Sequence, residues 1–205
     1  MTPPDPKQSS PFRTKVIIVL LLVAFVVITT SLGLWNNDAR QWFNEGRALS
    51  AQNRHQEALA AFDKALEFAP KDAATWNNKG TVLHSLGRHE EALAAYEKAL
   101  TFRPELAEAW RNKGIVLGRM GRHEEALWAF EQALVFEPEN AKAWTGKGLS
   151  LAALGRHDEA LTAYDQALTI EPKNATIWWH KGEILRKMDR KDEARATFDQ
   201  YEKYH

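Results

Sequence analysis

The sequence contains no cysteine, which excludes disulfide frameworks, thiolate zinc sites, cysteine nucleophiles and lipid attachment through cysteine. It also lacks net charge, because 27 basic residues balance 27 acidic ones among 205 residues, and this argues against a general nucleic-acid-binding protein. With only 11 Gly and 8 Pro the chain is neither collagen-like nor low in complexity, while 44% hydrophobic residues suffice for a core. We therefore predict a folded, mostly helical protein of one or two domains.

Motifs of catalysis are missing as well. The sequence has no G-x-G-x-x-G and no Gly-x-Ser-x-Gly, and no segment outside the repeats described below offers a unique nucleophile or acid. Function is argued from a site, and the sequence shows none for chemistry. We predict no enzymatic activity, no catalytic residue and no cofactor.

The chain begins with a proline-rich tail and a long apolar segment. Residues 1–15 hold four prolines and little that could pack, so we expect a disordered tail. Residues 16–35 carry no formal charge and open with the run VIIVLLLVAFVVI. A helix of that length rises about 30 Å, one hydrocarbon thickness. We predict one transmembrane helix over residues 16–35, a signal anchor in contact with membrane lipid.

The charges beside this segment predict its orientation. Lys7, Arg13 and Lys15 precede it, so the positive-inside rule keeps the N-terminus in the cytoplasm and places the rest of this single-pass protein outside. A cleavable signal peptide is the alternative, because the densest apolar run has thirteen residues and small residues follow at 29–31. No A-x-A pattern supports cleavage, which would release a secreted soluble adaptor.

A period of 34 residues organises the chain from residue 39 to residue 205. Each unit has a tryptophan, a glycine four residues later and a leucine three residues after that, followed by an alanine, an aromatic residue and, in the first four units, a proline. The tryptophans are Trp42, Trp76, Trp110, Trp144 and Trp178, and the glycines are Gly46, Gly80, Gly114, Gly148 and Gly182.

Each unit contains two amphipathic stretches, such as WNNKGTVLHSL and HEEALAAYEKAL, separated by Gly87 or its counterparts. Proline then ends the second helix. A long coiled coil is excluded, because Gly or Pro would interrupt its seam in every unit. The pattern predicts an all-α stack of helical hairpins.

The spacing W-x3-G-x2-L, then A-x3-F/Y, then P resembles the tetratricopeptide repeat. The resemblance implies a right-handed α-solenoid of five helix-turn-helix repeats, over residues 39–72, 73–106, 107–140, 141–174 and 175–205. It implies that a first-helix glycine such as Gly114 faces a second-helix alanine such as Ala126. Lys113 and its counterparts stand where the family often has leucine, and we expect their stems to pack while the ammonium groups reach water.

The last unit departs from the others. Arg195 and Glu202 stand where the earlier units have leucines. Because nothing stacks on a terminal repeat, its outer face must tolerate water. We expect the array to end there with a modified repeat.

In the resembled fold the first helices line a concave groove. The resemblance assigns to it Arg40, Asn44, Arg47, Asn78, His84, Arg111, Asn112, Arg119, Lys142, Leu149, Trp179, Arg186 and Lys187. Only Glu108 and Glu183 oppose the seven basic residues of this set, so we predict a positive groove. It would bind a protein or peptide with acidic side chains or a C-terminal carboxylate. The alternative is a solvated polar face.

Two repeating features of this sequence have specific interpretations. Asn44, Asn78 and Asn112 resemble the family's peptide-backbone-binding asparagines, and this ladder breaks at Gly146 and His180. The histidines His55, His89, His123 and His157 also recur, but residues one whole repeat apart cannot share an ion with bonds near 2 Å. We predict no metal site.

The sequence therefore favours a membrane-anchored scaffold for protein–protein interaction, with a peptide or protein segment in the groove and no nucleic acid. The alternative is a structural protein that forms homo-oligomers through exposed repeat ends, with an idle groove.

Overall fold

The computed structural model describes residues 37–205, and these residues form helices joined by short turns. Residues 37–51 are helical. The helices that follow are α2 (His55–Phe68), α3 (Ala73–Ser85), α4 (His89–Phe102), α5 (Ala107–Arg119), α6 (His123–Phe136), α7 (Ala141–Ala153), α8 (His157–Ile170), α9 (Ala175–Lys187) and α10 (Lys191–Tyr204). The predicted all-α array of paired helices is confirmed.

The turn inside each repeat requires a left-handed backbone. The φ angle is +74° at Gly87 and +75° at Gly121 and Gly155, and it is +59° at Asn53 and +57° at Asp189, which hold the same place in the first and last repeats. Glycine adopts this conformation without steric cost, and Asn and Asp tolerate it better than other residues. The predicted glycine break is confirmed, and Asn53 and Asp189 complete the series.

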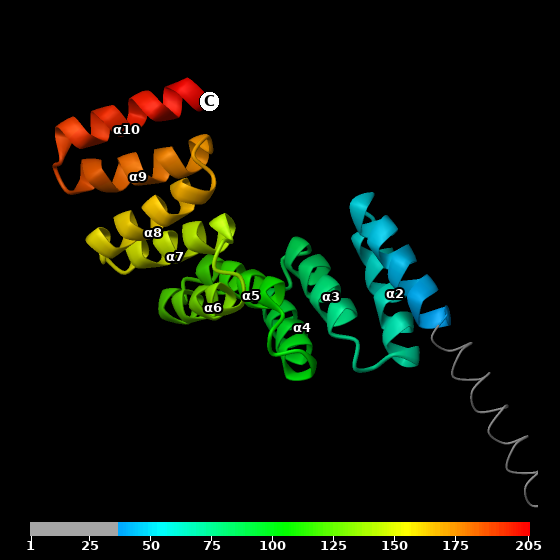
Figure 1. The fold of residues 1–205 in the computed structure, drawn as a ribbon. Helices are drawn as coiled ribbons and strands as arrows, with labels where there is room; N and C mark the ends of the chain where they lie inside the picture. The colour runs from blue at the N-terminus through cyan, green and yellow to red at the C-terminus, as the bar shows by residue number, and fades with distance from the viewer. Residues whose placement is uncertain (1–36) are drawn as a thin grey trace, which may run out of the picture.

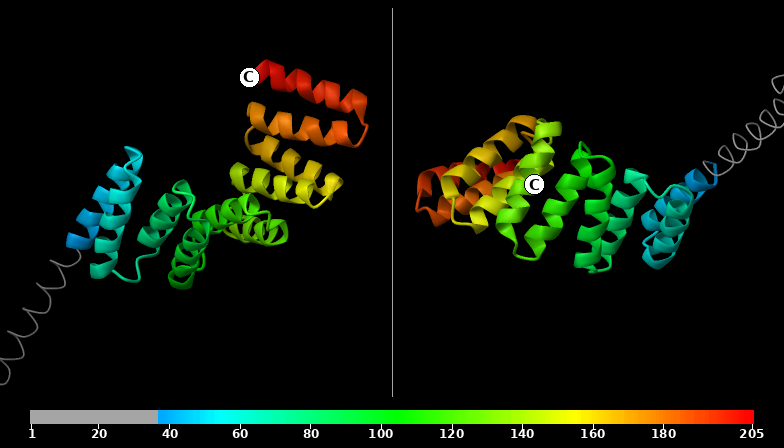
Figure 2. Two further views of the ribbon diagram at one scale, coloured as in Figure 1. Left: turned by 180° about the vertical axis from the view of Figure 1, so that it is seen from behind. Right: turned by 90° about the horizontal axis from the view of Figure 1, so that it is seen from below.

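The helices stack in chain order along an arc, from α2 at one end to α10 at the other (Figures 1 and 2). Among the labelled helices, α3, α5 and α7 each contact the next odd-numbered helix, whereas no even-numbered helix contacts another. Helices on the inside of a curved stack lie closer together than those outside. The odd-numbered helices are therefore the inner helices and the even-numbered ones the outer helices.

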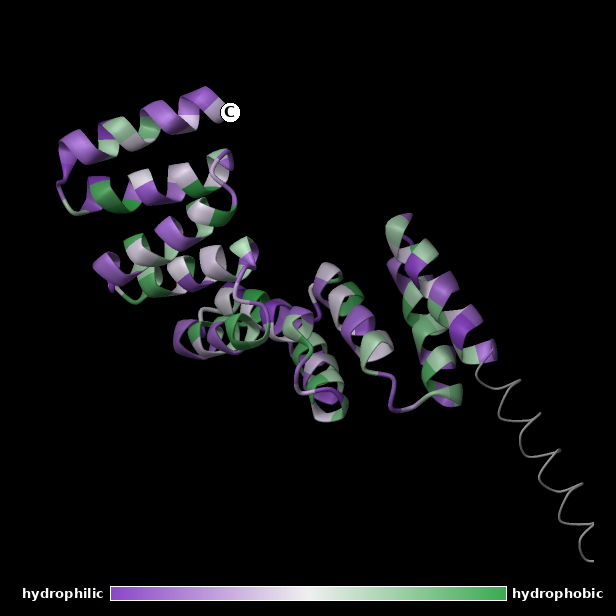
Figure 3. Ribbon diagram, viewed as in Figure 1, coloured by the Kyte–Doolittle hydropathy of each residue, from purple (hydrophilic) through white to green (hydrophobic). Residues whose placement is uncertain are grey.

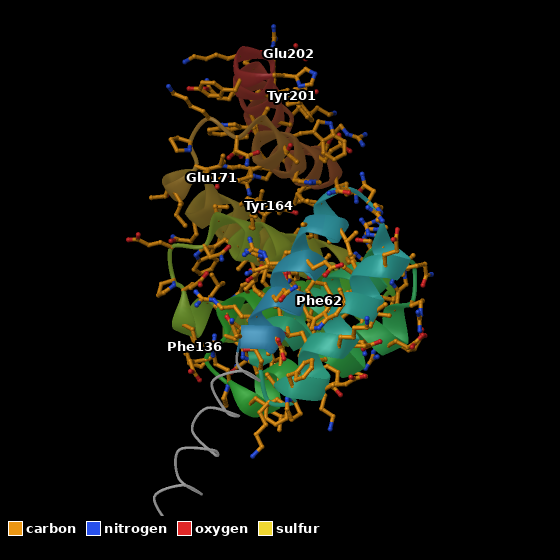
Figure 4. The ribbon with its side chains drawn as sticks, turned by 90° about the vertical axis from the view of Figure 1, so that its right-hand side faces the viewer. Phe62, Phe136, Tyr164, Glu171, Tyr201 and Glu202 are labelled. Carbon is orange, nitrogen blue, oxygen red and sulfur yellow. The ribbon has the colours of Figure 1, made fainter. Side chains whose placement is uncertain are left out.

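The recurring spacing of glycine and aromatic residue builds the core of each repeat. A Cβ atom on Gly148 would lie 2.5 Å from Cε1 of Tyr164, and one on Gly80 would lie 2.7 Å from Cε1 of Tyr96. Both tyrosine side chains are buried, and Figure 4 shows Tyr164 within the stack. The expectation that Gly114 faces Ala126 is wrong: the atoms nearest to a Cβ added there belong to the Phe130 ring, at 3.0 Å, because the ring occupies the space that a Cβ would need.

Tryptophan ties each repeat to the loop before it. The indole N–H of Trp76 donates to the carbonyl oxygen of Pro70 at 2.9 Å, and that of Trp110 donates to Pro104 at 2.8 Å. The same bond recurs from Trp144 to Pro138 and from Trp178 to Pro172. The indole rings pack beside the core while their polar ends satisfy a turn carbonyl.

In the second to fifth repeats, the lysine before the glycine bridges neighbouring repeats. Lys113 lies over the Trp110 ring at 5.8 Å, and its ammonium group is 2.9 Å from Glu97 on the preceding outer helix. Lys147 does the same with Trp144 and Glu131. These lysine side chains are about one fifth exposed, between 16% and 24%. The predicted packing of the stem is confirmed, and the ammonium group finds a carboxylate as well as water.

The last helix has a polar outer surface. Arg195 and Glu202 are exposed on α10, which contacts α9 and no other described helix. Figure 3 colours most of α10 as hydrophilic, and Figure 4 places Tyr201 and Glu202 at the end of the stack. The predicted polar outer face of this repeat is confirmed.

The predictions for residues 1–15 and 16–35 fall outside the described residues. Within residues 37–205, no helix is both long and apolar enough to span a bilayer.

Candidate functional site: the groove of the inner helices

The predicted groove residues all lie on inner helices or on the helical residues 37–51. Most are exposed, whereas Asn78 and His84 on α3 and Arg111 and Asn112 on α5 are half-buried. The structure brings three of the predicted residues together in one hollow, namely Arg119, Lys142 and Leu149. This hollow lies between α5, α7 and the start of α9, near the middle of the array.

The hollow has an apolar floor that sequence reasoning missed. It measures about 670 Å³, and its lining includes Ile115, Phe130, Gly146, Leu149 and Ile177. Ile115 and Leu149 are 40% and 43% exposed, which is high for large apolar side chains. We call this hollow the Gly146 pocket.

Gly146 is the residue that opens this pocket. Asn112 and His180, its counterparts in the neighbouring repeats, carry side chains that lie over the repeat before them. Gly146 instead lies against the Phe130 ring, and even a Cβ there would collide with that ring. The break in the asparagine ladder was the sequence signal for this pocket.

Two of the three ladder asparagines, Asn78 and Asn112, are engaged inside the protein. The Asn78 amide donates to the carbonyl oxygen of Ala74 at 2.8 Å, and the Asn112 amide donates to Oδ1 of the buried Asn77 at 3.1 Å. Arg111 in turn donates to Oδ1 of Asn112 at 3.4 Å. A ligand backbone would have to displace these contacts, so Asn112 is poorly placed as a free peptide-binding amide.

Two basic side chains line the Gly146 pocket. Arg119 and Lys142 are exposed and have no carboxylate within 4.0 Å among the described residues. By contrast, Arg186 pairs with Glu183 at 2.9 Å, and Arg111 lies 3.7 Å from Glu108. Arg119 and Lys142 are thus free to meet a ligand beside the apolar floor, and within residues 37–205 Arg40, Arg47 and Lys187 are equally free towards the two ends of the array.

A second hollow, of about 640 Å³, contains carboxylates that reduce the predicted positive charge of the groove. Arg111 and Lys142 line it together with Glu137, Glu139 and Glu171. The prediction of a positive groove considers only Glu108 and Glu183, which lie on inner helices. The three glutamates of this hollow lie instead in the loops between repeats. The groove is thus basic around Arg119 and mixed in charge beside Arg111.

The histidines of the groove add little positive charge near neutral pH. Burial, together with Arg119 and His89, lowers the pKa of His84, and burial lowers the pKa of His180, which stacks on Tyr164 at 6.0 Å. Nδ1 of His84 is 3.3 Å from Nδ1 of His89. In the described part of the chain, no three His, Cys, Asp or Glu side chains are grouped so as to hold a metal ion.

Four family models match the chain, each described as a tetratricopeptide repeat. They cover residues 39–72, 71–134, 111–175 and 151–205. Residues 39–205 therefore belong to the tetratricopeptide repeat family. No curated protein sequence matches the chain significantly.

Several solved structures share this fold. One is MamA from residue 41 to its end from Desulfovibrio magneticus RS-1, with a TM-score of 0.76, 22% identity and coverage of 82% of this chain and 94% of that one. Another is YrrB, a TPR protein with an unusual peptide-binding site, with a TM-score of 0.70, 25% identity and coverage of 86% and 91%. The pilF protein of Pseudomonas aeruginosa has a TM-score of 0.77, 20% identity and coverage of 83% and 78%.

These findings define the coarse class. The chain carries a tetratricopeptide-type scaffold for protein–protein interaction, an α-solenoid of about five repeats.

Proposed function

We propose that the groove binds a helical or extended protein segment that places one apolar side chain in the Gly146 pocket and carboxylates against Arg119 and Lys142. The observation that carries this proposal is the coincidence of exposed apolar residues with unpaired cations. Ile115 and Leu149 are the exposed apolar residues, and they lie beside Arg119. Exposed apolar surface with a polar rim is typical of binding sites.

Carboxylates suit the rim for an electrostatic reason. A charge-assisted hydrogen bond from a guanidinium or ammonium group is about twice as strong as a neutral one. A glutamate, an aspartate or a free C-terminus of the partner could each accept it. The apolar anchor would contribute affinity, and the carboxylates would fix which segment binds and in which direction. The peptide-binding site of YrrB supports a peptide ligand for a chain of this fold.

A fluorescent peptide series tests the site. The probe is a fluorescein-labelled dodecapeptide with one tryptophan flanked by glutamates, titrated by anisotropy onto the full chain in detergent. Two control peptides replace the tryptophan by alanine or the glutamates by glutamine. We expect each control to bind at least about tenfold more weakly, which corresponds to ~1.4 kcal/mol.

Matched protein variants locate the binding. Arg119→Glu and Leu149→Glu should each weaken binding of the probe peptide at least about tenfold. Lys98→Glu makes the same charge change on the outer helix α4 and should leave binding unchanged, because Lys98 is exposed outside the groove. If all three variants bound the probe peptide with equal affinity, the groove would not be its binding site.

We also propose that residues 16–35 tether this scaffold to a membrane, with the repeats on the extracytoplasmic side. The absence of charge over these twenty residues and the basic residues before them support it. The full chain should remain in the membrane pellet after alkaline extraction, whereas a variant lacking residues 16–35 should be released. Protease added outside intact cells should digest residues 39–205. Digestion only after lysis would reverse the orientation.

A further inference from the structure

The outer helices carry one apolar surface that the groove does not explain. On α6, Trp128 is 50% exposed and Val135, two turns later on the same face, is 66% exposed. The Trp128 ring is held edge-on against Trp110, with ring centroids 4.9 Å apart. Glu124 lies one turn before Trp128. We call Glu124, Trp128 and Val135 the Trp128 stripe.

Trp128 and Val135 are particular to the third repeat, whereas Glu124 has acidic counterparts in Glu90, Asp158 and Asp192. Ala60, Ala94, Thr162 and Ala196 stand at the place of Trp128 in the other repeats, and Glu67, Thr101, Thr169 and Lys203 stand at the place of Val135. All eight of these residues are exposed, so the fold does not require an apolar side chain there. A tryptophan fixed in place by a neighbour and half exposed to water is typical of an interface anchor.

The stripe has the chemistry that the Gly146 pocket selects. The pocket offers apolar side chains at Ile115 and Leu149 beside the unpaired Arg119. The stripe offers Trp128 beside Glu124, which is exposed and has no cation within 4.0 Å among the described residues. Apolar surface thus meets apolar surface, and a free carboxylate meets a free guanidinium group.

The stripe does not line the pocket of its own molecule. On α6, His123 and Phe130 line the pocket together with residues of α5, α7 and the start of α9, whereas Trp128 and Val135 are exposed and lie outside that lining. Both belong to the middle of the arc, in the third and fourth repeats. A second copy displaced along a radius of the arc brings its outer face into the inner face of the first, as crescents nest.

We propose that the partner in the groove is a second copy of this chain, whose Trp128 stripe enters the Gly146 pocket. This inference rests on the proposed function, because it assigns an occupant to that same groove. The contact is heterologous, since the two copies use different surfaces. Each copy then retains one unused stripe or pocket, so the assembly continues as an open stack.

Sedimentation of the full chain in detergent tests the assembly. The average mass of the wild type should rise with protein concentration. Trp128→Ala and Leu149→Glu should each weaken association at least about tenfold. Thr162→Ala, at the matched position of the fourth repeat, should associate like the wild type. Circular dichroism of each variant confirms that its helices are intact.

Mixing the two defective variants gives the sharpest result. Trp128→Ala keeps an intact pocket, and Leu149→Glu keeps an intact stripe. The mixture should therefore form dimers and no larger assemblies, because the remaining stripe and pocket are the defective ones. A symmetric stripe-to-stripe dimer predicts instead that Leu149→Glu dimerises alone and that mixing adds nothing. That outcome would overturn the nested contact.

Because the chain has no cysteine, single introduced thiols report proximity without background. A mixture of Glu124→Cys and Arg119→Cys chains should be joined by a short bismaleimide, and neither chain should be joined to itself. If the wild type stays monomeric at every concentration but still binds the acidic probe peptide, this inference alone is contradicted. If the wild type neither associates nor binds the probe peptide, the proposed function is contradicted as well.

Discussion

At the scale of single residues, glycine has two different structural roles in this protein. Gly87 and its counterparts adopt positive φ in the turns. Gly148 and its counterparts lie in helices, where glycine costs about 1 kcal/mol relative to alanine, and they are kept because an aromatic ring fills the space beside them. Gly118 is a third case, because the nearest atom to an added Cβ is Cβ of Ala126 at 3.9 Å.

This difference gives opposite predictions for one substitution. Gly148→Ala should destabilise the protein by ~1–2 kcal/mol, because overpacking against Tyr164 outweighs the gain in helix propensity. Gly118→Ala should stabilise it by ~0.5–1 kcal/mol, since the same gain meets no clash. Urea unfolding followed by circular dichroism measures both. Stabilisation by Gly148→Ala would show that the ring is free to move aside.

At the scale of elements, the inner helices begin in different ways. The Asn140 side chain caps α7 by accepting from the Ala143 N–H at 3.0 Å, and Asp72 caps α3 in the same manner at 2.9 Å. Asn174 holds the equivalent place before α9 but donates to Glu171 and makes no capping bond. The same residue type therefore has different roles at two helix starts.

Asn140→Ala should destabilise the protein by ~1 kcal/mol, the usual effect of losing an N-cap. Asn174→Ala is the matched control and should cost about 0.3 kcal/mol, because no capping bond is lost. The midpoints of urea unfolding compare the two variants. Equal losses would contradict the capping role of Asn140.

At the scale of the whole molecule, stability depends on neighbours along the stack. Each interior repeat is packed on both sides, whereas α10 contacts only α9 among the described helices. In a repeat array the free energy of local opening falls where one interface is missing. The end of the array is therefore its least protected part.

Hydrogen exchange of the full chain measures this gradient. Amides of α10 should exchange at least about tenfold faster than those of the central outer helix α6, a difference of ~1.4 kcal/mol in opening free energy. The matched 14-residue lengths of these two helices make the comparison direct. Equal protection would mean that the array opens as one cooperative unit.

The fold was predictable because it is periodic. Trp110, Gly114 and Phe130 recur at fixed steps, and each step reports one local contact that repeats in every unit. The groove was only partly predictable. Arg119 and Leu149 followed from their places in the repeat, but the Gly146 pocket depends on what one unit lacks, and the charge of the groove depends on carboxylates in loops such as Glu139.

The helices, the position of each turn and the polar outer face of the last repeat follow from the amino-acid sequence, because they depend on contacts within one repeat or between neighbours. The packing of Gly148 against Tyr164, the engagement of Asn112 and the position of Trp128 outside the lining of the Gly146 pocket emerge only in the folded stack. Those features depend on how the curvature of the stack directs side chains from different repeats, and a period of 34 residues does not encode that curvature.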